Sequence, residues 1–176
     1  MFIPRPLPAD YCASFGGYLR HVPGGDILEI LASQGEETIA LLEDIGDADA
    51  RYRYDDGKWS LKQVLGHLID TERVLLYRAM AAARGDRTRQ PGFDQDAWEA
   101  MAPHDELDLE DLLEEFWLVR STTLHFFRTV DADALTRRGV SGGGRRFTVG
   151  AMAWIIAGHE AHHLNVIDEK YLPGLP

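Results

Sequence analysis

FTVGAMAWIIAGHEAHHLNVI, residues 147–167, joins an apolar run directly to three histidines. Its apolar residues recur every three to four positions, which predicts a helix that begins at Thr148, a good N-cap residue, and continues to about Tyr171. On this helix His159 and His163 lie on the same apolar face. A helix that turns such a face inward needs partner helices, so the stretch indicates a helical bundle with histidines in its core.

Three further segments show helical spacing of their apolar residues, and they cover about 26–45, 60–85 and 108–130. The second segment opens with Ser60 and Gln63, three residues apart, which is the pattern of a capping box. Four amphipathic helices predict an all-α fold, a four-helix bundle.

The connections between these helices differ in length and composition. A polar stretch of residues 85–106 separates helices two and three; it predicts a long loop with one helical turn around 96–101. The glycine-rich residues 139–146 are expected to form an irregular link before the last helix. Strand-like alternation occurs briefly at 51–54 and is weak elsewhere. We expect residues 1–22 to be an irregular lead-in and 23–176 to form a single domain, a size that can bury a core.

Composition narrows the class of protein. With 29 acidic against 18 basic residues the formal net charge is −11, which disfavours nucleic-acid binding because such binding needs cationic contacts to phosphate. No apolar run approaches the roughly 18 residues of a membrane span, and the N-terminus lacks the pattern of a secretory signal. Cys12 is the single cysteine, so an intramolecular disulfide is excluded. These features predict a cytoplasmic protein that binds neither nucleic acid nor a membrane.

The pair His159 and His163 suggests a metal site, and a third ligand is expected from another helix. His67 lies on the inner side of the second predicted helix, whereas His125 falls off the apolar stripe of the third and is expected to be solvated. Buried imidazoles without partners would each cost about 1–3 kcal/mol, a cost that a metal removes. His162 sits at the edge of the stripe and is a weaker candidate, suited to an outer position around the site. The remaining two histidines, His21 and His104, lie in predicted loops.

The same letters, His159-Glu160-Ala161-His162, satisfy the H-E-x-x-H pattern of zinc proteases. The extended form of that pattern needs glycine and histidine where Val166 and Glu169 stand. Glu160 is also rotated by about 100° from His159, off the apolar face. We therefore interpret the protease pattern as a coincidence of spacing.

Two segments resemble the signatures of DinB-like proteins. GKWSLKQVLGHLIDTERVLLYRAM, residues 57–80, is similar to the first signature, and residues 147–167 are similar to the second. PGFDQDAWEAMAP, residues 91–103, resembles a loop of the YfiT-type branch, a group of metal-dependent hydrolases. The resemblance spans residues 26–171 and implies a four-helix bundle that forms homodimers.

The resemblance also implies a divalent metal, zinc or nickel, held by His67, His159 and His163. Iron and manganese are compatible with three histidines as well. Asp70, three residues after His67, is a candidate for orienting an imidazole. His162 is a candidate for a position around the metal ligands, without binding the metal itself.

Three functions remain open for such a site. The wider superfamily implies transfer of a low-molecular-weight thiol to an electrophilic substrate, and this is the function that we favour because a thiol co-substrate supplies its own nucleophile. The alternative is a metal-dependent hydrolase, in which a metal-bound hydroxide attacks the substrate. A second alternative is a non-catalytic, stress-related metal-binding bundle in which His162 completes a closed site.

Overall fold

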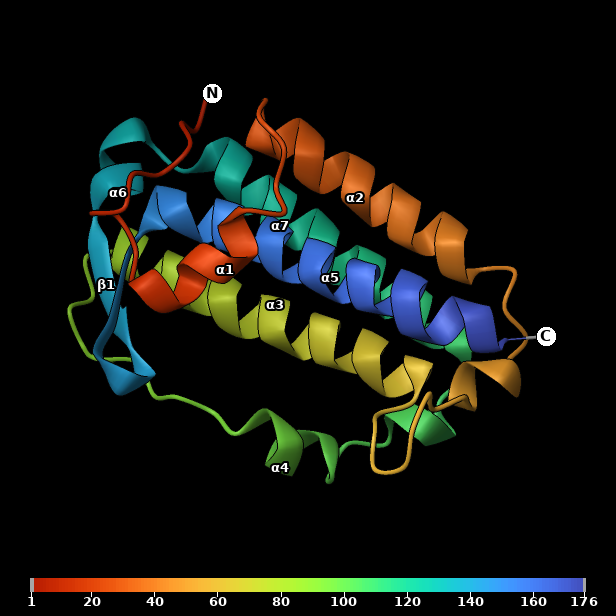
Figure 1. The fold of residues 1–176 in the computed structure, drawn as a ribbon. Helices are drawn as coiled ribbons and strands as arrows, with labels where there is room; N and C mark the ends of the chain where they lie inside the picture. The colour runs from red at the N-terminus through yellow and green to blue at the C-terminus, as the bar shows by residue number, and fades with distance from the viewer. Residues whose placement is uncertain (1, 176) are drawn as a thin grey trace.

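The computed structural model describes residues 2–175, and four long helices form its body (Figure 1). They are α2 (Ile27–Leu42), α3 (Leu61–Ala83), α5 (Leu109–Thr129) and α7 (Val149–Val166). The predicted four-helix bundle and its long connection between the second and third of these helices are confirmed. Among the described helices, none combines the length and the apolar character that crossing a membrane requires.

The helices begin where the sequence predicted them to begin, because side chains satisfy their first free N–H groups. Ser60 Oγ accepts from the Gln63 N–H at 3.1 Å and Gln63 Oε1 accepts from the Ser60 N–H at 3.0 Å, so the capping box of α3 is complete. Thr148 Oγ1 accepts from the Ala151 N–H at 3.2 Å at the start of α7.

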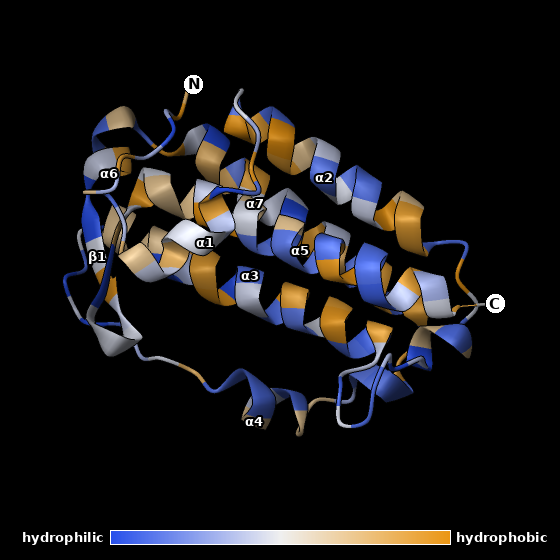
Figure 2. Cartoon of the chain, viewed as in Figure 1, coloured by the Kyte–Doolittle hydropathy of each residue, from blue (hydrophilic) through white to orange (hydrophobic). Residues whose placement is uncertain are grey.

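Helix α7 is buried on all sides over its first twelve residues. Both α2 and α3 pack against α5 and against α7, and the N-terminal segment covers a further side of α7. Residues 149–160 are all buried as a result, including the polar ones. Figure 2 shows that α2, α3 and α5 each carry hydrophilic as well as hydrophobic residues, as expected for helices with one side in water.

The glycine-rich link is a β-hairpin, which corrects the prediction of an irregular segment. Strands β1 (Arg138–Ser141) and β2 (Arg145–Thr148) pair antiparallel, and a tight turn, Gly142–Gly144, joins them. Gly143 and Gly144 have φ values of 71° and 75°, which only glycine adopts without strain. The stretch 51–54, in contrast, contains no strand.

The first 22 residues contain two helical turns that periodicity did not predict, η1 (Ala13–Phe15) and α1 (Gly16–Leu19). Helix α1 crosses α7 at Gly158, where an added Cβ would lie 2.6 Å from the backbone of Tyr18. A helix of four residues is too short to show a periodic pattern. Its position depends on the close approach that Gly158 allows.

The long loop between α3 and α5 contains the predicted helical turn as α4 (Gln95–Glu99) and runs back along α3 (Figure 1). The other short elements are η2 (Asp49–Arg51), η3 (His104–Glu106), α6 (Ala132–Thr136), the π-helical turn η5 (Ile167–Tyr171) and η6 (Leu172–Gly174). The last two continue α7, so the predicted end of the fourth helix near residue 171 is confirmed.

Candidate metal centre and its cavity

Three histidines from two helices meet between α3 and α7. One nitrogen of each of His67, His159 and His163 lies within 4.8 Å of the others, and the ring centroids are 4.7 to 5.0 Å apart. His67 and His159 are buried and His163 is half-buried. The structure thus brings together the three residues that the sequence nominated.

The arrangement fits a divalent metal. His67 Nε2 lies 3.2 Å from His159 Nε2. Zinc–nitrogen bonds of 2.0–2.1 Å in a tetrahedral site place two ligand nitrogens about 3.3 Å apart. Burial lowers the pKa of His67 to about 4 and that of His163 to about 3, and it lowers the pKa of His159 as well. All three imidazoles are therefore neutral near pH 7, which is the form that binds metal.

The groups around the three rings orient them. Thr71 follows His67 by one turn of α3, and its Oγ1 lies 3.4 Å from His67 Nδ1. The hydroxyl therefore neighbours Nδ1, while Nε2 of the same ring faces His159. The Trp59 ring lies 4.9 Å from the His67 ring, and the Tyr18 ring meets His159 edge-on at 5.3 Å. These contacts restrict the rotation of two imidazoles and shield them from water.

Asp70 has a different environment from the one we considered. Its carboxylate pairs with Arg73 at 3.7 Å, and Arg73 also pairs with Glu115 of α5 at 2.6 Å. Within residues 2–175 Asp70 makes no hydrogen bond to a histidine. The contact to His67 that we considered for a carboxylate is made by the hydroxyl of Thr71.

His162 lies outside the three-histidine cluster. It is half-buried, with ring centroids 5.7 Å from Tyr18, 6.0 Å from His21 and 5.1 Å from His163. The position agrees with the expected edge of the stripe. His125 is exposed, as predicted.

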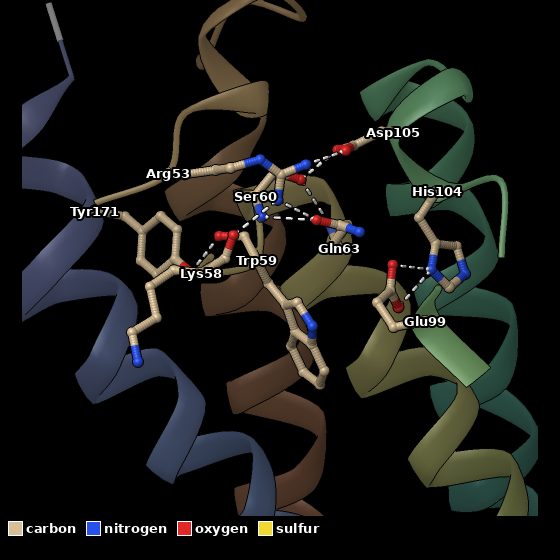
Figure 3. A network of polar contacts seen from close by, with 9 residues as sticks. All are labelled: Arg53, Lys58, Trp59, Ser60, Gln63, Glu99, His104, Asp105 and Tyr171. Carbon is tan, nitrogen blue, oxygen red and sulfur yellow. Dashed lines mark hydrogen bonds and ion pairs between the residues drawn. The ribbon is translucent and has the colours of Figure 1, made fainter. Parts of the chain in front are cut away.

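His104 is buried, although the sequence placed it in a loop. Its Nδ1 lies 2.9 Å from Glu99 Oε2, and the pair docks the long loop onto α3 (Figure 3). The ring occupies the space above Gly66, where an added Cβ would lie 2.2 Å from His104 Nδ1. The hydrogen bond that His104 donates to the Glu99 carboxylate raises the pKa of His104. Position 66, next to the candidate ligand His67, therefore requires a glycine: a larger side chain would collide with the His104 ring of the loop.

A second set of contacts holds the start of α3 (Figure 3). Asp105 accepts from Ser60 Oγ and pairs with Arg53, whose guanidinium also donates to Gln63. Tyr171 donates its hydroxyl to the Trp59 carbonyl at 2.8 Å. The long loop and the C-terminal turn thereby fix the helix end that carries Trp59 against His67.

A cavity of about 350 Å³ opens beside the histidines. Its walls come from α1, α3, α7, the long loop and the hairpin turn, and they include His67 and His159. The other lining residues with charged or polar side chains are Ser14, Tyr18, Thr71, Arg78, Asp94, Gln95 and Arg145. Cys12 is not in the wall, but Ser14, which donates to its sulfur at 3.4 Å, is. The single cysteine therefore lies next to a residue of the cavity wall.

Glu160 is buried, which corrects the expectation that it points away from the core. Arg120 Nη2 forms an ion pair with Glu160 Oε2 at 2.7 Å, without the geometry of a hydrogen bond. The same nitrogen donates a hydrogen bond to Glu72 Oε2 at 2.6 Å. Thr38 of α2 donates to Glu160 Oε1 at 2.8 Å. The apolar face that carries His159 does not predict whether the other faces of α7 are buried, because α1, α2 and α3 all pack against this helix. Glu160 is paired within this network, whereas the glutamate of a zinc protease has to be free to act as a general base.

We expect the metal-free protein to lose stability as the pH falls from 6.5 towards 4. In this window His67 takes up a proton in the unfolded chain, where its pKa is near 6.5, but stays neutral in the folded chain, where it is about 4. The free energy of unfolding therefore falls with falling pH by about 1.4 kcal/mol per pH unit for each such histidine. Urea unfolding at several pH values measures the slope. His67→Asn should make it shallower by about one proton, and equal slopes would contradict the assignment.

Comparisons with known proteins agree with this geometry. The model of the DinB superfamily matches residues 30–167. A protein of Oceanobacillus iheyensis named "Putative metal-dependent hydrolase" is 22% identical over 120 residues, which cover 68% of this chain and 69% of that protein.

Two solved structures share the fold. YfiT from Bacillus subtilis, described as a probable metal-dependent hydrolase with an unusual four-helix bundle topology, superposes with a TM-score of 0.64 at 17% identity, over 98% of this chain and 95% of its own. A mycothiol-dependent maleylpyruvate isomerase gives a TM-score of 0.69 at 13% identity, over 90% of this chain and 66% of the isomerase. At these identities the likeness concerns the fold alone.

Proposed function

The chain belongs to the DinB superfamily, and on that premise we propose that it is a metal-dependent enzyme that transfers a low-molecular-weight thiol to an electrophilic small molecule. We propose that His67, His159 and His163 hold one divalent ion. The observation that carries the proposal is the convergence of three neutral imidazoles beside a cavity of about 350 Å³. A catalytic zinc site usually has three protein ligands and a fourth position that is open to water or substrate.

Each residue around the site has a task in this proposal. With three neutral ligands a divalent ion keeps its full charge, and it lowers the pKa of a water or thiol that joins it. Thr71 keeps the His67 ring oriented by accepting from Nδ1, which leaves Nε2 free for the ion. Trp59 and Tyr18 cover two of the rings and exclude water.

Thiol transfer is favoured by what the described cavity wall lacks. Neither a cysteine nor a glutamate lines it, and Asp94, the one acidic residue in the described wall, caps α4. Glu160 is held by Arg120, and Asp70 by Arg73, so neither carboxylate is free beside the imidazoles to take a proton from water. A thiol needs less help, because its own pKa is far below that of water and because it brings the nucleophile. The fold is shared with an enzyme whose name includes mycothiol dependence.

Hydrolysis is the second candidate, and the names of two relatives support it. The Oceanobacillus protein is named "Putative metal-dependent hydrolase", and YfiT is described as "a probable metal-dependent hydrolase". A third possibility is a bundle that binds metal without catalysis. Homodimer formation stays a prediction, and the bound ion is expected to be zinc or nickel, with iron or manganese as further candidates.

The test is conjugation of monochlorobimane by mycothiol, bacillithiol or glutathione, with protein loaded with zinc or nickel. The thiol sulfur forms a bond to carbon, chloride leaves, and the thiol proton goes to solvent. We expect fluorescence to appear faster than without protein, and His67→Ala to abolish the gain. Hydrolysis of p-nitrophenyl acetate without any conjugation would favour the second candidate. Bound metal without either reaction would contradict both catalytic candidates.

A further inference from the structure

Arg78 is a buried cation without an acidic partner. The side chain is 6% exposed and lies on α3, in the wall of the cavity that also includes His67 and His159. Its Nη2 donates to the Pro91 carbonyl at 2.8 Å. Across residues 2–175, no carboxylate oxygen comes within the 4.0 Å of its guanidinium nitrogens that an ion pair requires.

The other buried arginine shows how this chain otherwise neutralises such a charge. Arg120 is fully buried, and two carboxylates, from Glu72 and Glu160, lie 2.6 and 2.7 Å from its Nη2. A buried charge without a partner is costly, so it is retained where something supplies the partner. The guanidinium of Arg78 lies 5.8 Å from the centre of the Phe93 ring, and Arg78 lines the cavity together with Phe93.

The cavity has two chemically different ends. His67 and Arg78 are 11 positions apart on α3, about 16 Å of helix, and side chains on a helix lean towards its N-terminus, here towards His67. Arg145 of β2 also lines the cavity, and its charge lowers the pKa of Arg78, second to the effect of burial. Apolar lining residues lie between or around the two ends: Phe15, Leu75, Phe93 and Ile155.

Asp94 is the one acidic residue among the lining residues in the described chain, and it is already engaged. Its Oδ1 accepts from the N–H groups of Asp96 and Ala97 at 3.1 and 3.2 Å, where it caps α4. Arg78 and Arg145 therefore leave the cavity with an excess of positive charge at the end away from the histidines.

We infer that the substrate carries a carboxylate, which Arg78 binds with help from Arg145, while the reactive end of the substrate faces the three histidines. A carboxylate meets a guanidinium with two parallel hydrogen bonds, a geometry that fixes orientation as well as charge. The inference rests on the proposed function, because it takes this cavity as the substrate site. It adds the class of substrate: an electrophile with an apolar middle and a terminal carboxylate.

The experiment compares 4-phenylbutyrate with 4-phenylbutan-1-ol as ligands of the metal-free protein. Without metal, the neutral imidazoles offer a carboxylate no positive charge, so selectivity for the acid over the alcohol reports on the arginines. Ligand-observed NMR titrations at constant ionic strength give both dissociation constants. We expect the acid to bind at least about tenfold more tightly than the alcohol, since a charge-assisted bond commonly contributes that much.

Four variants locate the preference. Arg78→Gln should abolish it, Arg78→Lys should reduce it severalfold because the charge stays and the paired hydrogen bonds are lost, and Arg145→Gln should reduce it less. Arg128→Gln, which removes an exposed charge near the end of α5, is the control and should leave it unchanged. Circular dichroism checks that each variant is folded. If Arg78→Gln fails to fold, the Arg78→Lys and Arg145→Gln variants decide.

Equal binding of acid and alcohol by the unaltered protein would overturn the inference, as would a preference that survives in every Arg78 and Arg145 variant that folds. Metal content is measured on the same samples. Selective binding of the acid by a protein that takes up no metal would overturn the proposed function alone. Metal uptake and thiol conjugation without selectivity would overturn the carboxylate inference alone.

Discussion

Replacing Arg120 with methionine is expected to lower the free energy of unfolding by about 3–5 kcal/mol, because removal of one partner leaves buried carboxylates uncompensated. Arg120 of α5 contacts Glu72 of α3 and Glu160 of α7, and it donates to the Leu31 carbonyl of α2 at 2.8 Å. With Thr38, which donates to Glu160, the network connects all four long helices. Methionine keeps most of the volume, so the loss reports on charge more than on packing.

Chemical denaturation of Arg120→Met beside Arg73→Gln makes this test specific. Arg73 also forms an ion pair between α3 and α5, with Glu115 at 2.6 Å, but its side chain is 49% exposed. An exposed pair is worth at most about 1 kcal/mol. Adding Glu72→Gln and Glu160→Gln to Arg120→Met should restore part of the stability, because the amides carry no charge. Similar losses for the two single variants would show that the buried network has no special role.

Replacing His67 with alanine is expected to reduce metal content from about one ion per chain to almost none. His67 is the one nominated ligand on α3, so without it two imidazoles of a single helix remain. Removing a residue that only hydrogen-bonds to a metal ligand already lowers metal affinity by about 10–100-fold. Removing a ligand itself should therefore lower metal affinity by more than about 100-fold. Elemental analysis of untagged protein, after incubation with zinc or nickel and desalting, measures the change.

His162→Ala is the matched control for this substitution. His162 is the same residue type, adjacent to the nominated ligand His163, and lies outside the cluster. It should retain about one ion per chain. The H-E-x-x-H alternative makes the opposite prediction, since it uses His159 and His162 and leaves His67 out. Metal lost from His162→Ala and kept by His67→Ala would therefore overturn the three-histidine assignment.

The residues replaced in the two predictions, Arg120 of α5 and His67 of α3, contact adjacent positions of α7 that have different surroundings. His159 faces α3 and the cavity, whereas Glu160 faces Arg120 and α2. A charged network therefore lies directly behind the candidate metal centre. Because Glu160 and His159 are consecutive on one rigid helix, the ion pairs that position Glu160 also set the rotation of α7 about its axis. Arg120→Met should for this reason be examined for metal affinity as well as for stability.

The sequence by itself determined the four long helices, the capping residues of α3 and α7, and the three histidines. These features are local: apolar residues recur with the period of a helix, Ser60 and Gln63 are three positions apart, and His159 and His163 are four apart. His67 was found by the same rule, because it lies on the inner face of its own helix. In a bundle, inner faces must meet, so the periodicity of two separate helices was sufficient to predict that their histidines converge.

Only the tertiary structure decided which other residues surround the site. The turns at the N-terminus, the hairpin and the burial of His104 depend on contacts between segments far apart in the sequence, such as α1 at Gly158 and the His104 ring at Gly66. Glu160 and Arg78 look like ordinary charges on helices, and nothing in their neighbourhood in the sequence reports that they are buried. Periodicity describes how one helix divides its faces between core and water. It does not tell which residue of a distant segment will occupy the space beside a charge, and that contact determines whether the charge is paired or left open to a cavity.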